Sequence, residues 1–184
     1  MLDDFGNQPA VDSPDGRKSV QLTSDGNFRV FSGRAVIAAR GLPDVMSNIE
    51  IGWSPDSTQF FVSYSNGGET GGYQVYMYRL NGSALTESTV PDVVAKRFRA
   101  KHWCEFRENN LFFPAWTPDS KVAFLVTEVY PTGDCRKEAG TFKGYSVDTA
   151  SAKVLRVFGE KQTQAIEKKC RVSGALTLPN WLSR

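Results

Sequence analysis

A short turn sequence recurs three times along this chain, and it constrains the fold more than any other feature. Proline presets φ at the second position of a tight turn, and Ser, Thr and Asp side chains can bond nearby backbone amides. Such a repeat indicates one structural unit used several times in succession. A tryptophan, Trp53 or Trp116, precedes the later copies. The copies are Ser13-Pro14-Asp15-Gly16, Ser54-Pro55-Asp56-Ser57 and Thr117-Pro118-Asp119-Ser120.

The segments after each turn have the pattern of β-strands. Apolar and polar residues alternate with a period of two, and turn residues separate one run from the next. We therefore expect each unit to form four antiparallel strands, the last two joined by a hairpin turn. The C-terminal segment 178–181 parallels 113–116 but lacks the Pro-Asp turn, so it is a degenerate fourth start. The clearest strands are 59–64, 73–78, 121–126, 142–147 and 153–158.

These residues resemble the TolB-type β-propeller repeat, a relative of the WD-type blade. The family pattern is an aromatic residue, Ser-Pro-Asp-Gly/Ser, an apolar strand, a loop, and an aromatic-rich strand that ends in a Gly-containing turn. The resemblance covers about residues 9–80 and 112–158. It implies an all-β protein of consecutive four-stranded antiparallel blades of partial β-propeller type, with one or two short helical insertions. Such blades commonly serve as scaffolds for protein or glycan binding.

About three blades are encoded here, whereas closed propellers have about four to eight. An open array leaves edge strands and apolar faces exposed, which proteins generally avoid. Three arrangements are open: a sheet stack capped by helices, a ring completed by a dimer, or a fragment of a larger protein. We favour the capped stack. The expected single domain, 1–184, comprises units at about 5–45, 47–90 and 111–159, a helical insertion at about 91–107 and a cap at 160–184.

The insertion after the second unit has the pattern of an amphipathic helix from about Asp92 to Arg107. It either packs on a blade and shows a solvated basic face, or presents Trp103 between Lys96 and Arg107 as a partner-binding patch, since Trp and Arg are enriched at interface anchors. If the helix ends near Lys101, Trp103 falls on an incoming strand. One face carries Val94, Phe98, His102 and Phe106, and the opposite and flanking positions carry Lys96, Arg97, Arg99, Lys101, Trp103 and Arg107.

The second helical segment, 160–169, reads as a short exposed helix in which Ile166 is the only strong apolar residue. It carries the chain toward a strand at 176–181.

Three cysteines are expected on one face of the blades. Cys135 lies in a loop within a blade, and Cys104 and Cys170 lie in connections between blades. We expect one disulfide that includes Cys135 and either neighbour, although three reduced thiols fit the count equally well. A bridge closing a loop of about 30 residues contributes roughly 3–4 kcal/mol in the chain-entropy model. A metal site is not expected, because a C-x-x-C pair and a second histidine are both missing from the sequence.

Catalytic signals are weak. His102 is the only histidine and lies on the apolar stripe of the expected helix, so packing explains it better than a role as a base. The aspartates of the repeat have structural duty in their turns, although paired carboxylates of the glycosidase kind stay an alternative. The glycine-rich segment 67–72 lacks the Lys-Ser/Thr of a phosphate loop. We expect neither enzymatic activity nor a cofactor.

The favoured function is a non-catalytic protein-binding module, periplasmic or secreted, such as an inhibitor or immunity-type protein that caps a partner. The alternatives are an oligomerising half-propeller, which would be a homodimer, and a fragment of a carbohydrate-active or hydrolytic propeller enzyme. The formal charge of +2 gives no strong field for nucleic acid or an anionic membrane, and the start at Met1 lacks a signal peptide, so a cytoplasmic location or a removed signal are both open. The candidate binding residues are Lys96, Arg99, Trp103, Arg107, Tyr130, Asp134 and Arg136, on a face that also carries Glu69, Thr70 and Lys137.

Overall fold

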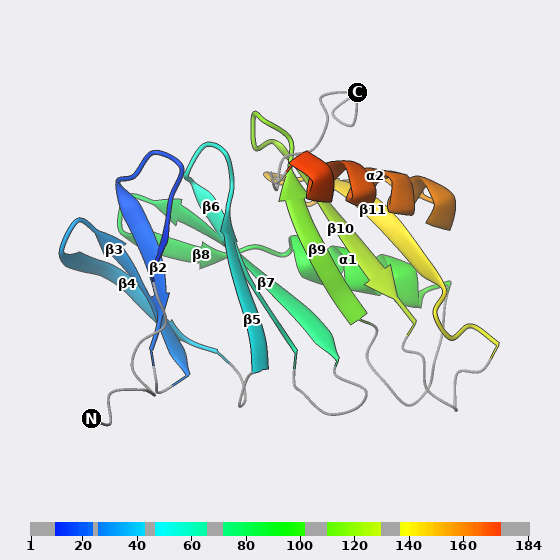
Figure 1. Ribbon diagram of the computed structural model, residues 1–184, viewed down its shortest axis with the longest axis horizontal. Helices are drawn as coiled ribbons and strands as arrows, with labels where there is room; N and C mark the ends of the chain where they lie inside the picture. Colours follow the sequence, from blue (N-terminus) through cyan, green and yellow to red (C-terminus); the bar gives the residue numbers. More distant parts are fainter. Residues whose placement is uncertain are drawn as a thin grey trace.

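Three four-stranded antiparallel sheets stand side by side in the computed structural model (Figure 1). The structure describes residues 10–23, 26–42, 47–65, 72–101, 110–129 and 137–173. Within each sheet the strands pair in chain order, as consecutive hairpins require. The expected all-β class with consecutive four-stranded antiparallel units is therefore confirmed.

The strands divide evenly among the sheets. The first sheet holds β1 (Val11–Asp12), β2 (Lys18–Leu22), β3 (Asn27–Ser32) and β4 (Ala35–Gly41). The second holds β5 (Ser47–Trp53), β6 (Gln59–Ser65), β7 (Tyr73–Asn81) and β8 (Ala84–Glu87). The third holds β9 (Asn110–Trp116), β10 (Val122–Glu128), β11 (Phe142–Asp148) and β12 (Val154–Phe158).

Each repeat turn is closed by its own side chains. In the second sheet the Ser54 hydroxyl donates to the Asp56 carboxylate over 2.7 Å and accepts from the Gln59 amide over 2.9 Å. The first and third turns repeat this pattern. Burial raises the pKa of Asp56, but the hydrogen bonds from Ser54 and Thr58 outweigh burial and leave that pKa below its usual value. The aspartates thus have the structural duty that the sequence indicates.

The turns are also bonded to one another. The Asp15 amide donates to the Ser57 hydroxyl of the second turn, and the Asp56 amide donates to the Ser120 hydroxyl of the third, both over 3.1 Å. Ser57 and Ser120 have φ of 60° and 59°, a left-handed conformation that usually favours glycine. The first turn has Gly16 at this position, with φ of 66°. Serine therefore replaces glycine in the later turns, where its hydroxyl accepts a hydrogen bond from the preceding turn.

Apolar side chains fill the spaces between neighbouring sheets. Phe28 of the first sheet packs against Phe60 and Tyr78 of the second, with ring centroids 5.5 and 4.9 Å apart. Phe61 of the second sheet stacks on Trp116 of the third, at 5.7 Å. All residues of β6 are buried, because this central strand has a sheet on each side.

The outer face of the first sheet differs in its residues from the corresponding faces of the second and third sheets. Val20 and Leu22 of β2 are buried against the second sheet, whereas Ser19 and Gln21 point the other way beside exposed Arg29. Asp12 stands in the position that Trp53 and Trp116 occupy in the later units. On β1 and β2 the first sheet thus lacks the apolar residues with which the others pack on a preceding sheet, whereas Phe31 of β3, which pairs with Ser19, stands where Tyr78 stands in the second sheet. At the same distance from the turn, the later sheets carry Phe60 and Val62, or Ala123 and Leu125.

Helix α1 (Val90–Arg99) closes the space between the second and third sheets. It starts with Pro91 in its first turn and buries Val94 and Phe98 among the side chains of both sheets. Helix α1 ends at Arg99, close to Lys101 as the shorter alternative had it, and the longer helix to Arg107 is wrong. The Lys101 amide bonds the Phe98 carbonyl in a tighter turn, and basic residues in the last helical turn stabilise the end of the helix. Residues 102–109 lie outside the described part of the chain.

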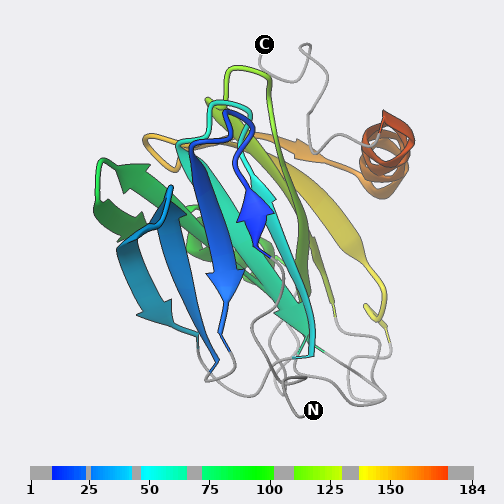
Figure 2. The same cartoon turned by 60° about the vertical axis from the view of Figure 1, so that its left-hand side comes forward.

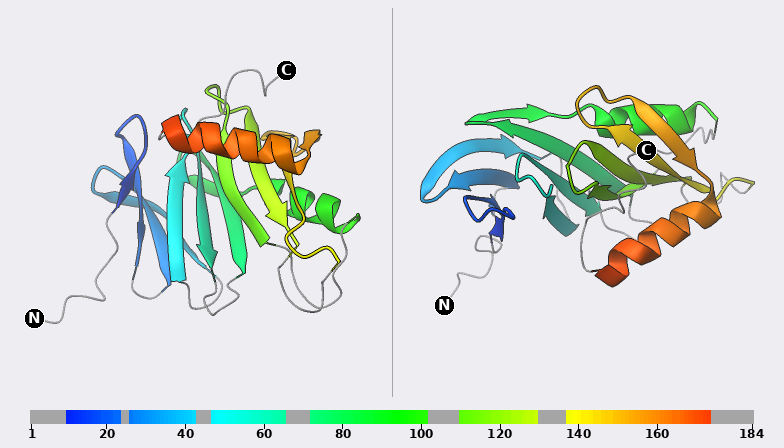
Figure 3. Two further views of the ribbon diagram at one scale, coloured as in Figure 1. Left: turned by 45° about the vertical axis from the view of Figure 1, so that its right-hand side comes forward. Right: turned by 90° about the horizontal axis from the view of Figure 1, so that it is seen from above.

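Helix α2 (Glu160–Ser173) covers the outer face of the third sheet, on the side opposite α1 (Figures 2 and 3). The expectation of a short exposed helix is wrong, because Thr163, Ile166 and Cys170 are all buried. Gly144 of β11 lets the helix approach closely. A Cβ atom there would lie 2.8 Å from the Thr163 hydroxyl. The expected strand at 176–181 lies outside the described residues.

The order in space is therefore first sheet, second sheet, third sheet, α2 (Figure 1). Helix α2 lies at one end of this order and α1 lies between two sheets, so the choice among a capped stack, a dimeric ring and a fragment stays a prediction. Among the described helices, none is both long enough and apolar enough to span a membrane.

Candidate functional site

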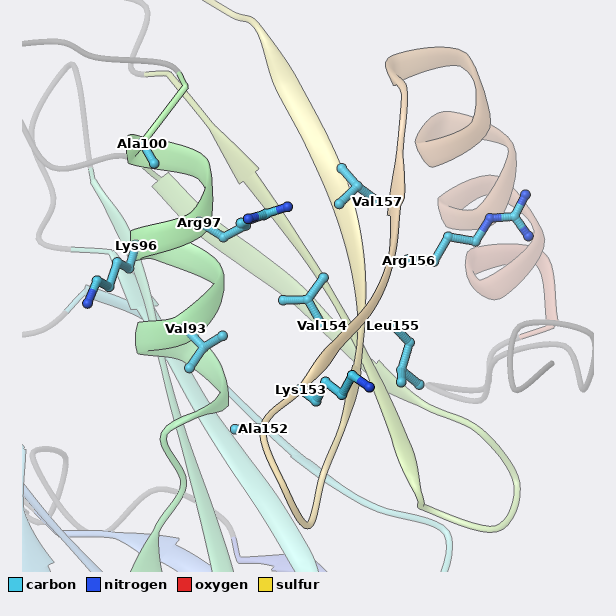
Figure 4. A pocket seen from close by; sticks show the side chains of 10 residues that line it. All are labelled: Val93, Lys96, Arg97, Ala100, Ala152, Lys153, Val154, Leu155, Arg156 and Val157. Atoms are coloured by element: carbon cyan, nitrogen blue, oxygen red, sulfur yellow. The ribbon is translucent and has the colours of Figure 1, made fainter.

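A groove lies between α1 and β12, with a volume of about 640 Å³ (Figure 4). Helix α1 contributes one wall, and the last hairpin and strand of the third sheet contribute the other. Its lining residues are Val93, Lys96, Arg97, Ala100, Ala152, Lys153, Val154, Leu155, Arg156 and Val157.

The strand that forms one wall is the outermost strand of its sheet. In the part of the chain that the structure describes, β12 pairs only with β11. Its pairing register shifts near Leu155, between the pairs of Val154 and Arg156. Leu155 and Val157 of this strand are 48% and 44% exposed. The groove thus runs along an open sheet edge.

Side chains flank this edge on both sides. Figure 4 shows Val154 and Val157 on the side of β12 that faces α1, where Val93 and Arg97 point toward them. Leu155 lies on the opposite side of the strand, as does Arg156, which points toward α2 (Figure 4). Each side of the edge therefore offers both an apolar surface and a cation.

The charges of the groove have one sign. Its lining holds four cations, Lys96, Arg97, Lys153 and Arg156, and no carboxylate. All four are exposed. The guanidinium carbon of Arg156 lies 5.1 Å from the centroid of the Phe158 ring, a cation–π contact that holds it in place.

Arg97 also acts on a buried phenol beside the groove. Burial raises the pKa of Tyr145, on β11, to about 12, and the positive charge of Arg97 opposes that rise. The charges on the other side of α1 are negative. A smaller cavity of about 210 Å³ there includes Glu87 and Asp92 in its lining and no cation. Helix α1 therefore separates a basic groove from an acidic cavity.

The predicted site residues are only partly brought together. Lys96 lines the groove, whereas Arg99 is exposed on the same helix and does not line it. Lys137 is exposed in the turn before β11. Sequence reasoning missed the contribution of β12, although the pattern Lys153-Val154-Leu155-Arg156-Val157 puts cations beside an apolar strand. Trp103, Arg107, Tyr130, Asp134, Arg136, Glu69 and Thr70 lie outside the described residues.

Cys170 lies in α2 rather than in an open connection between blades. It is 3% exposed and packs in a cluster with Phe158 and Ile166, and burial followed by the charge of Glu167 raises the pKa of its thiol. Cys104 and Cys135 lie outside the described residues, so the expected disulfide stays a prediction. Within the described ranges, no group of three or more His, Cys, Asp or Glu side chains is placed to hold a metal ion.

The sheets and their order define a partial β-propeller-like protein. No protein-family model matches the chain, and no curated protein matches it. Among solved structures, it is similar to the Cps50 (Swd1) β-propeller domain of Myceliophteria thermophila, with a TM-score of 0.48 and 10% identity over 84% of this chain and 43% of that one. It is also similar to a putative 6-phosphogluconolactonase of Bacteroides fragilis, with a TM-score of 0.43 and 14% identity over 84% of this chain and 39% of that one. The chain thus spans less than half the length of either.

Proposed function

We propose that this chain is a non-catalytic protein-binding module whose partner docks in the groove between α1 and β12. The observation that carries the proposal is the edge of β12, where exposed Val157 faces Arg97 on the α1 side and exposed Leu155 lies beside Arg156 on the other side of the strand. Protein interfaces typically combine an apolar centre with a polar rim, and arginine is enriched in them. The backbone beside this groove is already ordered in a sheet and a helix, so little conformational entropy is lost when a partner binds.

The two ends of the stack support a module that works without closing a ring. A dimeric ring would need a free apolar face at each end, but α2 covers the third sheet with Ile166 and Cys170. On the first sheet, Ser19 and Gln21 occupy the positions that would meet a preceding sheet. Since Phe31 and exposed Val36 share that outer face, the cover by α2 is the observation that disfavours the oligomerising half-propeller.

We further propose that the chain is a TolB-type repeat protein that acts in the periplasm or outside the cell as an inhibitor or immunity-type protein. The repeat turns support the TolB-type relation, because Ser54 and Asp56 form a closed hydrogen-bonded unit that the other copies repeat. The basic groove supports the capping role, since it suits an acidic surface on the partner.

Site-specific photo-cross-linking tests the proposal. A photoreactive amino acid replaces Leu155 on the edge strand β12 or, as a matched control, Val36 on β4. Both are exposed aliphatic residues on the outermost strand of a sheet, at 48% and 52% exposure. We expect the Leu155 variant to form an adduct with a second protein in extracts of the native host, identified by mass spectrometry. Equal labelling from both positions, or none from position 155, would overturn the proposal.

A further inference from the structure

The outer edge of β12 has the properties of a site that accepts another strand. Alternate N–H and C=O groups of an outermost strand point away from its sheet, and an extended chain can pair with them. Proteins usually block such edges by covering them, by keeping them very short, or with charged side chains and β-bulges. Strand β12 has a register shift near Leu155, and its regular pairing covers Arg156–Phe158. Strand β12 keeps five residues, Val154–Phe158, and in the described part of the chain its outer side pairs with no strand.

The side chains beside this edge specify what would pair with it. Residues of an added strand alternate between two sides. Those on one side would meet Val93, Val154 and Arg97, and those on the other would meet Leu155 and Arg156 (Figure 4). Both sides therefore favour carboxylates together with aliphatic groups, and a basic segment would be repelled.

We propose that β12 binds an extended acidic segment of a partner protein as an additional β-strand. The segment carries carboxylate and aliphatic side chains on both of its sides, over about five residues or roughly 17 Å. This inference rests on the proposed function, of which it specifies the partner's chemistry and the mode of binding.

A lipid surface fits the geometry less well. Anionic membranes attract flat basic patches, whereas here Arg97 and Arg156 lie on opposite sides of the β12 edge, with Val157 on the side of Arg97 and Leu155 on the side of Arg156. The cations could also serve only to keep the edge soluble, since charged side chains block pairing between edges. The test separates these roles.

The probe is an eight-residue synthetic peptide with two repeats of Glu-Glu-Val-Val, capped at both ends. This order places Glu and Val on each side of an extended strand. A peptide with Lys in place of Glu is the charge control. Binding is measured by fluorescence anisotropy, and hydrogen exchange of backbone amides is followed by NMR in the full chain. Strand β4, the outermost strand of the first sheet, is the internal control.

We expect the acidic peptide to bind and to slow the exchange of outward amides in β12 by at least about tenfold, with β4 unchanged. Arg97→Glu and Arg156→Glu should each weaken binding by at least about tenfold. Arg29→Glu, a reversal at an exposed position on β3, should leave it unchanged. The Lys peptide should not bind.

Two results would reject strand addition. Binding without protection of β12 would show that the groove attracts acidic chains without pairing. If the acidic peptide does not bind, strand addition is rejected. Binding of the protein to phosphatidylserine vesicles would then show that the cations attract lipid, and no vesicle binding would show that they only keep the edge soluble. Either result would still permit cross-linking from Leu155 to a folded protein surface, so the proposed function and this inference fail separately.

Discussion

Replacing Gly144 with alanine should destabilise the protein through the contact between β11 and α2. A Cβ atom at this position would lie 2.6 Å from Cζ of Phe124 and 2.8 Å from the hydroxyl oxygen of Thr163. Ordinary contacts of a Cβ begin near 3.4 Å, so the ring and the helix must both move by several tenths of an ångström. Overpacking of a filled core costs about 1–3 kcal/mol. Because two neighbours on different elements are involved, we expect a loss of about 2–3 kcal/mol.

Urea unfolding followed by tryptophan fluorescence measures this loss. Gly159 provides the matched control, because it lies just before α2 and a Cβ there would have nothing within 4 Å. Gly159→Ala should cost about 1 kcal/mol or less, because its carbonyl accepts the first bond of α2 from the Thr163 amide and alanine is a poorer N-cap than glycine. If Gly144→Ala is as stable as Gly159→Ala, α2 does not pack on β11, and the capped end of the stack is wrong.

Three further predictions concern α1, the groove and the turns. Phe98→Ala should cost about 3–5 kcal/mol in urea unfolding, because the ring is fully buried, whereas exposed Arg99→Ala should cost less than about 0.5. Arg97→Gln should raise the pKa of Tyr145 further above about 12, measured by ultraviolet absorbance, since it removes an opposing positive charge. The pKa values of the turn aspartates lie below 3.8, so the stability they contribute is present above that pH and should be lost as the pH falls through the lower folded values, followed by acid titration with NMR.

The sequence predicted the sheets well because the information for each turn is local. Ser54, Asp56 and Gln59 lie within six residues of one another and close the turn together. The bonds between turns could not be predicted in the same way. The amide of Asp56 and the hydroxyl of Ser120 are 64 positions apart, and only the stacking of sheets brings them together.

The groove was harder to predict than the fold. Strand β12 was expected at about its observed position, but its status as an open edge depends on what packs beside it. Arg97 and Arg156 are far apart along the chain, and their sharing of one groove follows from where α1 packs. The end of α2 was also missed, because burial against the third sheet decides it, and the end of α1 was predicted only as one of two alternatives, because a tight turn decides it.

Hydrogen exchange of the free protein tests the central claim most directly. The account places β10 between layers and leaves the outer side of β12 open. Amides of β10 should therefore exchange slowly throughout, whereas alternate amides of Val154–Phe158 should exchange about as fast as those on the outer side of β4. Uniformly slow exchange along β12 would contradict the account, because it would mean that the edge proposed for binding is already covered.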